Sequence, residues 1–95
     1  MMKFIVTWTY RPEHRDAVHK RFLEGGGSLP EGVTQIGRWM AAGRNFGVAV
    51  YETNDASALA RNALNWSDLM DVDVVPALSD HEAGALVAEL AAASR

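Results

Sequence analysis

Cysteine is absent from this chain of 95 residues. Its absence excludes disulfides and thiolate metal ligands, so a domain this small depends on packing or on association for its stability. A long apolar run is also missing: no stretch approaches the roughly 20 apolar residues that a membrane helix requires. The first ten residues are too short, and too polar at Thr7 and Thr9, for a signal peptide. We therefore predict a cytoplasmic protein with no membrane partner.

Basic charge is scarce in the second half of the chain. Residues 1–54 carry seven Lys or Arg and five Asp or Glu, and residues 55–95 carry two and seven, which gives +2 and −5 and the net charge of −3. A nucleic-acid-binding protein usually concentrates positive charge on one patch. The charge balance therefore predicts no nucleic-acid partner.

The composition is that of an ordinary globular protein, with 48% hydrophobic and 22% charged residues. A second core within 95 residues would bury too little apolar surface to offset the entropy of ordering it. We predict a single domain over residues 1–95.

Four segments have the β-branched, aromatic and alternating composition of strands. They are residues 3–10, 33–40, 46–52 and 72–78. Pro76 cannot donate to a strand ladder, so it predicts an edge strand or a strand end.

Three segments carry helix signals. The first runs from about Pro12 to Glu24 and ends at three glycines, and the second follows possible caps at residues 53–55. The third begins at Ser79, which has the spacing of a capping box with Glu82. The order β-α-β-β-α-β with an extra C-terminal helix predicts an α+β, ferredoxin-like antiparallel sheet with two helices on one face.

Two helices on one face leave the other face bare. We predict that Ile5, Ile36, Met40 and Ala49 lie on it, because they alternate and are apolar. A large exposed apolar patch normally marks an interface. The pattern therefore predicts a homodimer in which two sheets face each other and enclose a lumen suited to a small molecule.

Several short motifs in the same order resemble the bacterial domain-of-unknown-function 3303 family, from Lys3 to about Leu86. They are Val6-Thr7-Trp8, Arg11-Pro12-Glu13-His14-Arg15-Asp16, Gly37-Arg38-Trp39, Glu52-Thr53-Asn54-Asp55, Trp66-Ser67-Asp68-Leu69 and Val74-Val75-Pro76.

The resemblance implies a dimeric α+β barrel, a superfamily that includes cofactor-free monooxygenases, muconolactone-type isomerases, haem-degrading proteins and stress-responsive binders. It leaves the chemistry open, because one scaffold serves several reactions. In the family pattern the tryptophan at the place of Trp39 is often followed by histidine, whereas this chain has Met40. If a catalytic histidine belongs there, this chain lacks it.

The candidate ligand-binding residues are Thr7, Thr9, Arg38, Met40, Glu52 and Trp66. Arg38 lies in an otherwise apolar strand, where its guanidinium can hold a carboxylate or phenolate in bidentate fashion. The alternative, given equal weight, is an ion pair of Arg38 with Glu52 or Asp68. The Thr7 and Thr9 hydroxyls can orient a ligand, although β-propensity alone also explains these threonines.

Trp66 follows a helix at a place where it can line a cavity mouth. Glu52 is a possible base, although a surface ion pair explains it as well. His14 and His19 are five residues apart and so do not share a helix face, and His81 lies in the capping segment. The sequence thus predicts no metal site and no cofactor, and places no histidine in the lumen for haem.

Three functions remain open from the sequence. The first is a dimeric protein that binds a small aromatic or carboxylate-bearing molecule in its lumen. The second is a cofactor-free monooxygenase or isomerase, with Glu52, Asp68 or a stray histidine as the proton acceptor. The third is a structural or regulatory dimer with a filled lumen. The sequence does not decide whether the protein is an enzyme.

Overall fold

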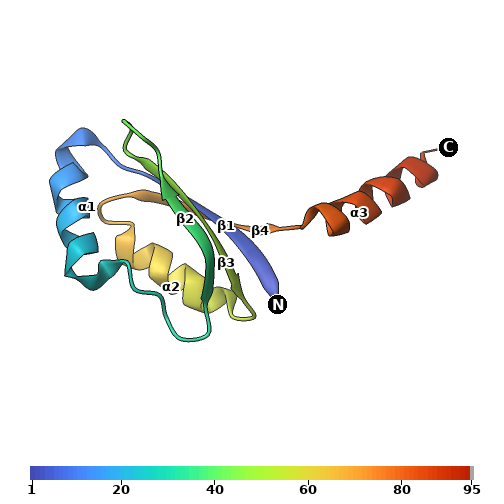
Figure 1. Ribbon diagram of the computed structural model, residues 1–95, viewed down its shortest axis with the longest axis horizontal. Coiled ribbons are helices and arrows are strands. Elements are labelled where there is room, and N and C mark those ends of the chain that lie inside the picture. Colours follow the sequence, from blue (N-terminus) through green and yellow to red (C-terminus); the bar gives the residue numbers. More distant parts are fainter. Residues whose placement is uncertain (95) are drawn as a thin grey trace.

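Four strands pair into one antiparallel sheet in the computed structural model, which describes residues 1–94 (Figure 1). The strand order is β2-β3-β1-β4. The strands are β1 (Met2–Thr9), β2 (Thr34–Met40), β3 (Phe46–Thr53) and β4 (Asp71–Ala77). With this sheet and three helices, the chain is a small α+β protein. Pro76 lies on the edge strand β4, as its missing N–H predicted.

The core lies on one face of the two central strands. Phe4 pairs with Tyr51 and Val6 with Ala49, and all four are buried together with Leu59. We call this side of the sheet the covered face, because helices α1 and α2 lie over it (Figure 1). The opposite side, which carries Ile5, Thr7 and Thr9 of β1, is the open face.

Helix α1 (Arg15–Arg21) is shorter than predicted, because its two ends adopt other helical forms. A 3-10 turn over Pro12–His14 precedes it and a π-helical turn over Phe22–Gly26 follows it. Gly25 has φ 98°, a left-handed conformation that favours glycine and ends the helical run. The segment faces the sheet through Val18, which is buried.

Helix α2 (Ala56–Trp66) is fixed at both ends. Its first turn is capped by Asp55, whose carboxylate accepts a hydrogen bond from the backbone N–H of Ala58. Leu59 and Trp66 of this helix are buried on the side of the molecule where the helices lie over the covered face. Thr53, just before the cap, is 1% exposed and donates its hydroxyl to the carbonyl of Gly32, which ties β3 to the loop before β2.

Helix α3 (Asp80–Ala93) begins with the predicted capping box, in which the Ser79 hydroxyl accepts from the Glu82 N–H and the Glu82 carboxylate accepts from the Ser79 N–H. The helix extends away from the sheet (Figure 1), and Leu86, Val87 and Leu90 are exposed. In residues 1–94 no helix combines the length and apolar character needed to cross a membrane.

A β-bulge in β2 corrects one of the predicted face assignments. Gln35 lies opposite Tyr51 and Gly37 lies opposite Val50, so Ile36 is an extra residue. An extra residue reverses the alternation beyond it. Met40 was predicted on the bare face, but it lies opposite Gly47 on the covered face.

The prediction for Ala49 is also wrong, because this residue is fully buried in the core. Ile5 and Ile36 are exposed, at 38% and 54%. Strand β3 carries apolar side chains on both sides, with Val48 and Val50 on the open face. Its sequence therefore shows no alternation of polar and apolar residues that could identify the buried side.

The indole ring of Trp8 packs directly on Gly47, since a Cβ at this position would lie 2.2 Å from the ring. We expect Gly47→Ala to lower the free energy of unfolding by about 1–3 kcal/mol, because the ring must shift within packed surroundings. Urea denaturation measures the change. The control is Gly84→Ala in α3, where a Cβ meets nothing within 4 Å and the helix gains propensity. Equal stability of Gly47→Ala and the native protein would contradict this packing.

Candidate ligand-binding cavity

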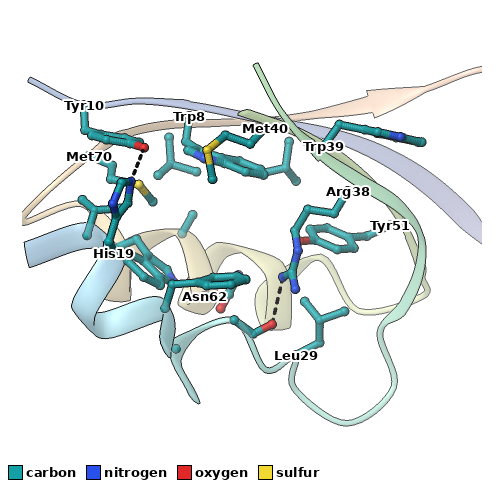
Figure 2. Close-up of a pocket in the computed structure, with 18 of the residues that line it drawn as sticks. Trp8, Tyr10, His19, Leu29, Arg38, Trp39, Met40, Tyr51, Asn62 and Met70 are labelled. Carbon is teal, nitrogen blue, oxygen red and sulfur yellow. Dashed lines mark hydrogen bonds between the residues drawn. The ribbon is translucent and has the colours of Figure 1, made fainter. Parts of the chain in front are cut away.

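A cavity of about 520 Å³ lies between the covered face and the helical layer (Figure 2). Its volume falls in the range of roughly 300–1,000 Å³ that is usual for small-molecule sites. Helix α1 contacts mainly the two helical turns that flank α1 itself, whereas α2 packs against β4. The space between α1 and the sheet is therefore left open, and the cavity lies there.

Most of the cavity wall is apolar. Trp8 and Val72 form its floor, Val18 and Phe22 come from the helical layer, and Trp66 stands at the end of α2. Aromatic walls of this kind suit a flat, apolar ligand.

Arg38 brings a positive charge into this apolar space. Its guanidinium donates to the carbonyl oxygen of Gly27 at 2.8 Å and lies over the Phe22 ring, with Cζ 5.2 Å from the ring centroid (Figure 2). Within residues 1–94 no carboxylate lies within 4.0 Å of it. A half-buried arginine without an acidic partner is uncommon and is suited to bind an anion.

The alternative ion pairs predicted for Arg38 are wrong, because both acids are bound elsewhere. Glu52 lies 3.2 Å from Lys3 on the open face. Asp68 accepts two hydrogen bonds of 2.8 Å from Arg21.

The Arg21–Asp68 pair supports one wall of the cavity. Arg21 also donates to the carbonyl of Asn65 at 2.9 Å, and its guanidinium lies over the ring of Trp66 at 5.2 Å. The hydrogen bonds from Arg21 hold the pKa of Asp68 below its ordinary value. The pair thus links the end of α1 to the end of α2 beside the cavity.

A second polar group lines the cavity at some distance along it from Arg38 (Figure 2). The Tyr10 hydroxyl lies 3.3 Å from Nε2 of His19, and the two rings meet edge to face at 83°. Tyr10 follows β1, and its backbone N–H donates to Asn45 in the hairpin. His19 projects from α1.

The structure divides the predicted ligand-binding residues between the two faces of the sheet. Arg38, Met40 and Trp66 line the cavity. Thr7, Thr9 and Glu52 lie on the open face, where their neighbours are residues such as Val48, Phe46 and Lys3. A single chain therefore does not bring all six residues to one site.

Sequence reasoning missed Tyr10 and His19 as cavity residues. The signal was available for His19, because it lies three and four residues before Phe22 and Leu23, which also line the cavity. That spacing places the three on one side of a helix.

No metal site is formed by the described part of the chain. Residues 1–94 contain no group of three His, Asp or Glu side chains positioned to hold a metal ion.

Comparison with protein families assigns the chain over nearly its whole length. Residues 2–91 match the family described as Domain of unknown function (DUF3303). The chain belongs to the DUF3303 family. A comparison with curated proteins found no match. The description of DUF3303 names no reaction or ligand, so the cavity itself has to indicate the function.

The Arg21–Asp68 pair predicts a pH-dependent stability. Because the pKa of Asp68 is lowered in the folded chain, its stabilising effect is present above the unfolded value of about 3.9 and is lost as the pH falls through the lower folded value. Asp68→Asn should therefore lower the Tm at pH 7, and the gap from the native protein should close as the pH falls below about 4. The control is Glu31→Gln, which removes an exposed carboxylate that is in no ion pair in the described residues. A Tm gap that stays constant from pH 7 to 3 would contradict the role of Asp68.

Proposed function

We propose that this DUF3303 chain binds a small aromatic, carboxylate-bearing molecule in the cavity between the covered face and the helices. The observation that carries the proposal is the Arg38 guanidinium, which enters an apolar cavity without an acidic partner in the described chain. An arginine among apolar side chains can bind a carboxylate through charge-assisted hydrogen bonds, with fewer competing waters than on an open surface. The nearby tryptophans give the ring of such a ligand flat surfaces to pack on.

The proposal also places the chain in a ferredoxin-like, dimeric α+β barrel. The strand order β2-β3-β1-β4, with α1 and α2 crossing the same face, supports the ferredoxin-like arrangement. The open face supports the dimer, since Val75 and Trp39 on it are 50% and 58% exposed. Val50 lies beside Ile5 on the same side, so the apolar residues are neighbours and not scattered.

Helix α3 favours a second copy of the chain as the partner. The helix leaves β4 and extends beyond the sheet (Figure 1), with exposed leucines and a valine on its surface. A helix of 14 residues is marginal in water without tertiary packing. The described chain offers no other segment to cover it, whereas a twofold partner brings both a second open face and a second α3.

The dimer can be tested by placing a charge on the open face. Val75→Lys should convert a dimer to a monomer, because each interface would then hold two buried, unpaired ammonium groups. Light scattering coupled to size exclusion gives the mass. The control is Ser57→Lys on the exposed surface of α2, which should stay dimeric. A native protein that is monomeric at micromolar concentration would refute the dimer.

The ligand site can be tested with simple aromatic acids. Binding of benzoate, phenylacetate and cinnamate is measured by quenching of tryptophan fluorescence, since Trp8 and Trp66 line the cavity. Arg38→Gln should weaken binding about tenfold or more, which corresponds to about 1.5–3 kcal/mol for a charged hydrogen bond. Arg44→Gln, in the exposed hairpin turn, removes the same charge and should not change the affinity. Equal affinities of the native protein and Arg38→Gln would refute the assignment.

A cofactor-free monooxygenase or isomerase is the second candidate, favoured by one observation. The two acids considered as proton acceptors, Glu52 and Asp68, are tied to Lys3 and Arg21, but His19 lines the cavity. In an isomerase, His19 would take a proton from one carbon of the bound acid and return it to another. Recovery of the acid unchanged after incubation supports binding alone, and conversion that depends on His19 supports the enzyme. The third candidate, a structural or regulatory dimer with a filled lumen, stays a prediction, because its lumen lies between two facing sheets and is a different space from the cavity of a single chain.

A further inference from the structure

Besides Asn62 of α2, the polar side chains of the cavity are of two chemical kinds, and Figure 2 shows these two apart from each other. Arg38 is a cation and offers only donors. Tyr10 and His19 form a hydrogen-bonded pair in which each partner can donate or accept, depending on the tautomer of the imidazole. The groups between them are largely apolar, with Trp8 and Met40 drawn above that space in Figure 2.

We propose that the Tyr10–His19 pair is a second subsite, which selects ligands that carry a hydroxyl at the end opposite their carboxylate. This inference rests on the proposed function, since the carboxylate is assigned to Arg38. The ligand class it points to is a hydroxyaryl carboxylic acid, with the ring between the two subsites. A phenolic hydroxyl matches the pair because it donates one hydrogen bond and accepts another.

The pair is placed to exchange partners with a ligand. Its hydrogen bond is 3.3 Å long, at the weak end of the range for such contacts, and it lies at an exposed part of the cavity. An incoming hydroxyl can donate to Nε2 of His19 and accept from the Tyr10 hydroxyl, so no polar group loses its partner when the pair opens. A ligand that ends in hydrogen cannot replace these bonds.

Two different elements hold the pair in position. Tyr10 is anchored by the hydrogen bond of its backbone N–H to the carbonyl of Asn45, at 3.2 Å. His19 is carried by α1 next to Val18, which is buried beneath the helix. Because Arg38 comes from β2, the distance between the two subsites is set by the sheet and by the position of α1, and it selects the length of the ligand as well as its polarity.

The test compares each hydroxylated acid with its deoxy analogue. The probes are 4-hydroxybenzoate, 4-hydroxyphenylacetate and 4-hydroxycinnamate against benzoate, phenylacetate and cinnamate, with affinities from calorimetry. For the acid of matching length, we expect the native protein to prefer the hydroxylated form by roughly fivefold or more. Tyr10→Phe and His19→Phe, alone and together, should abolish this preference, so that the hydroxylated acid loses more affinity than its deoxy analogue.

Two further variants separate this subsite from the carboxylate site and from general effects. Arg38→Gln should weaken both members of each pair and keep their ratio. His81→Phe removes a histidine from the exposed start of α3 and should change neither value. Circular dichroism and Tm establish that each variant is folded, and Tyr10→Phe is the milder change where His19→Phe is unstable.

The outcomes distinguish the two proposals. Equal binding of both members of every pair, or an unchanged preference in the folded Tyr10→Phe and His19→Phe variants, overturns the subsite and leaves the proposed function standing. A loss of affinity that is the same for both acids in these variants also overturns it, since that is the mark of a merely structural role. If no acid of any length binds the native protein, the proposed function fails and the subsite fails with it.

Discussion

The pairing of β1 with β3 determines both the core and the cavity. Along β1 the covered face carries Phe4, Val6 and Trp8, and their partners on β3 become smaller from Tyr51 to Ala49 to Gly47. At the first of these pairs two large rings meet and, with Leu59 of α2, fill the interior. At the last pair the glycine accepts the indole of Trp8 flat against the strand, so the space above it stays open under α1. The gradient in side-chain size thus decides where packing stops and where a ligand can enter.

The β-bulge at Ile36 places the charge in that space. If β2 continued its alternation from Gln35 without the extra residue, Arg38 would point to the open face and would be solvated there. The bulge turns it to the covered face, under the roof formed by Phe22 and Gly27. There it is half-buried, bonded to the Gly27 carbonyl and over the Phe22 ring, and within residues 1–94 no carboxylate lies within 4.0 Å of it. The bulge therefore decides that this charge faces the cavity and not the open face.

The sequence predicted the elements better than it predicted the faces. Alternation located the strands, Pro76 identified an edge, and the Ser79–Glu82 spacing identified a capping box, because each of these signals is local. The side to which Met40 points depends on one extra residue in pairing with β3, which no local pattern reveals. Residues of α1 were harder to assign for a related reason, since its flanking 3-10 and π turns depart from the 3.6-residue period. His19 was not predicted for this cavity because the predicted ligand site was the lumen between two sheets, although its spacing from Phe22 and Leu23 is helical.

Both free edges of the sheet are poor templates for a further strand. On β4, Pro76 leaves a gap in the row of donors, and Asp71 and Asp73 add negative charge to the exposed edge. On β2, the bulge bends the outer strand and interrupts its regular spacing. Strand addition from a neighbouring molecule is disfavoured at either side, which protects a sheet with apolar residues on both faces from aggregating edge to edge. The edges of this sheet therefore offer a neighbouring molecule fewer regularly spaced donors and acceptors than two uninterrupted edge strands would.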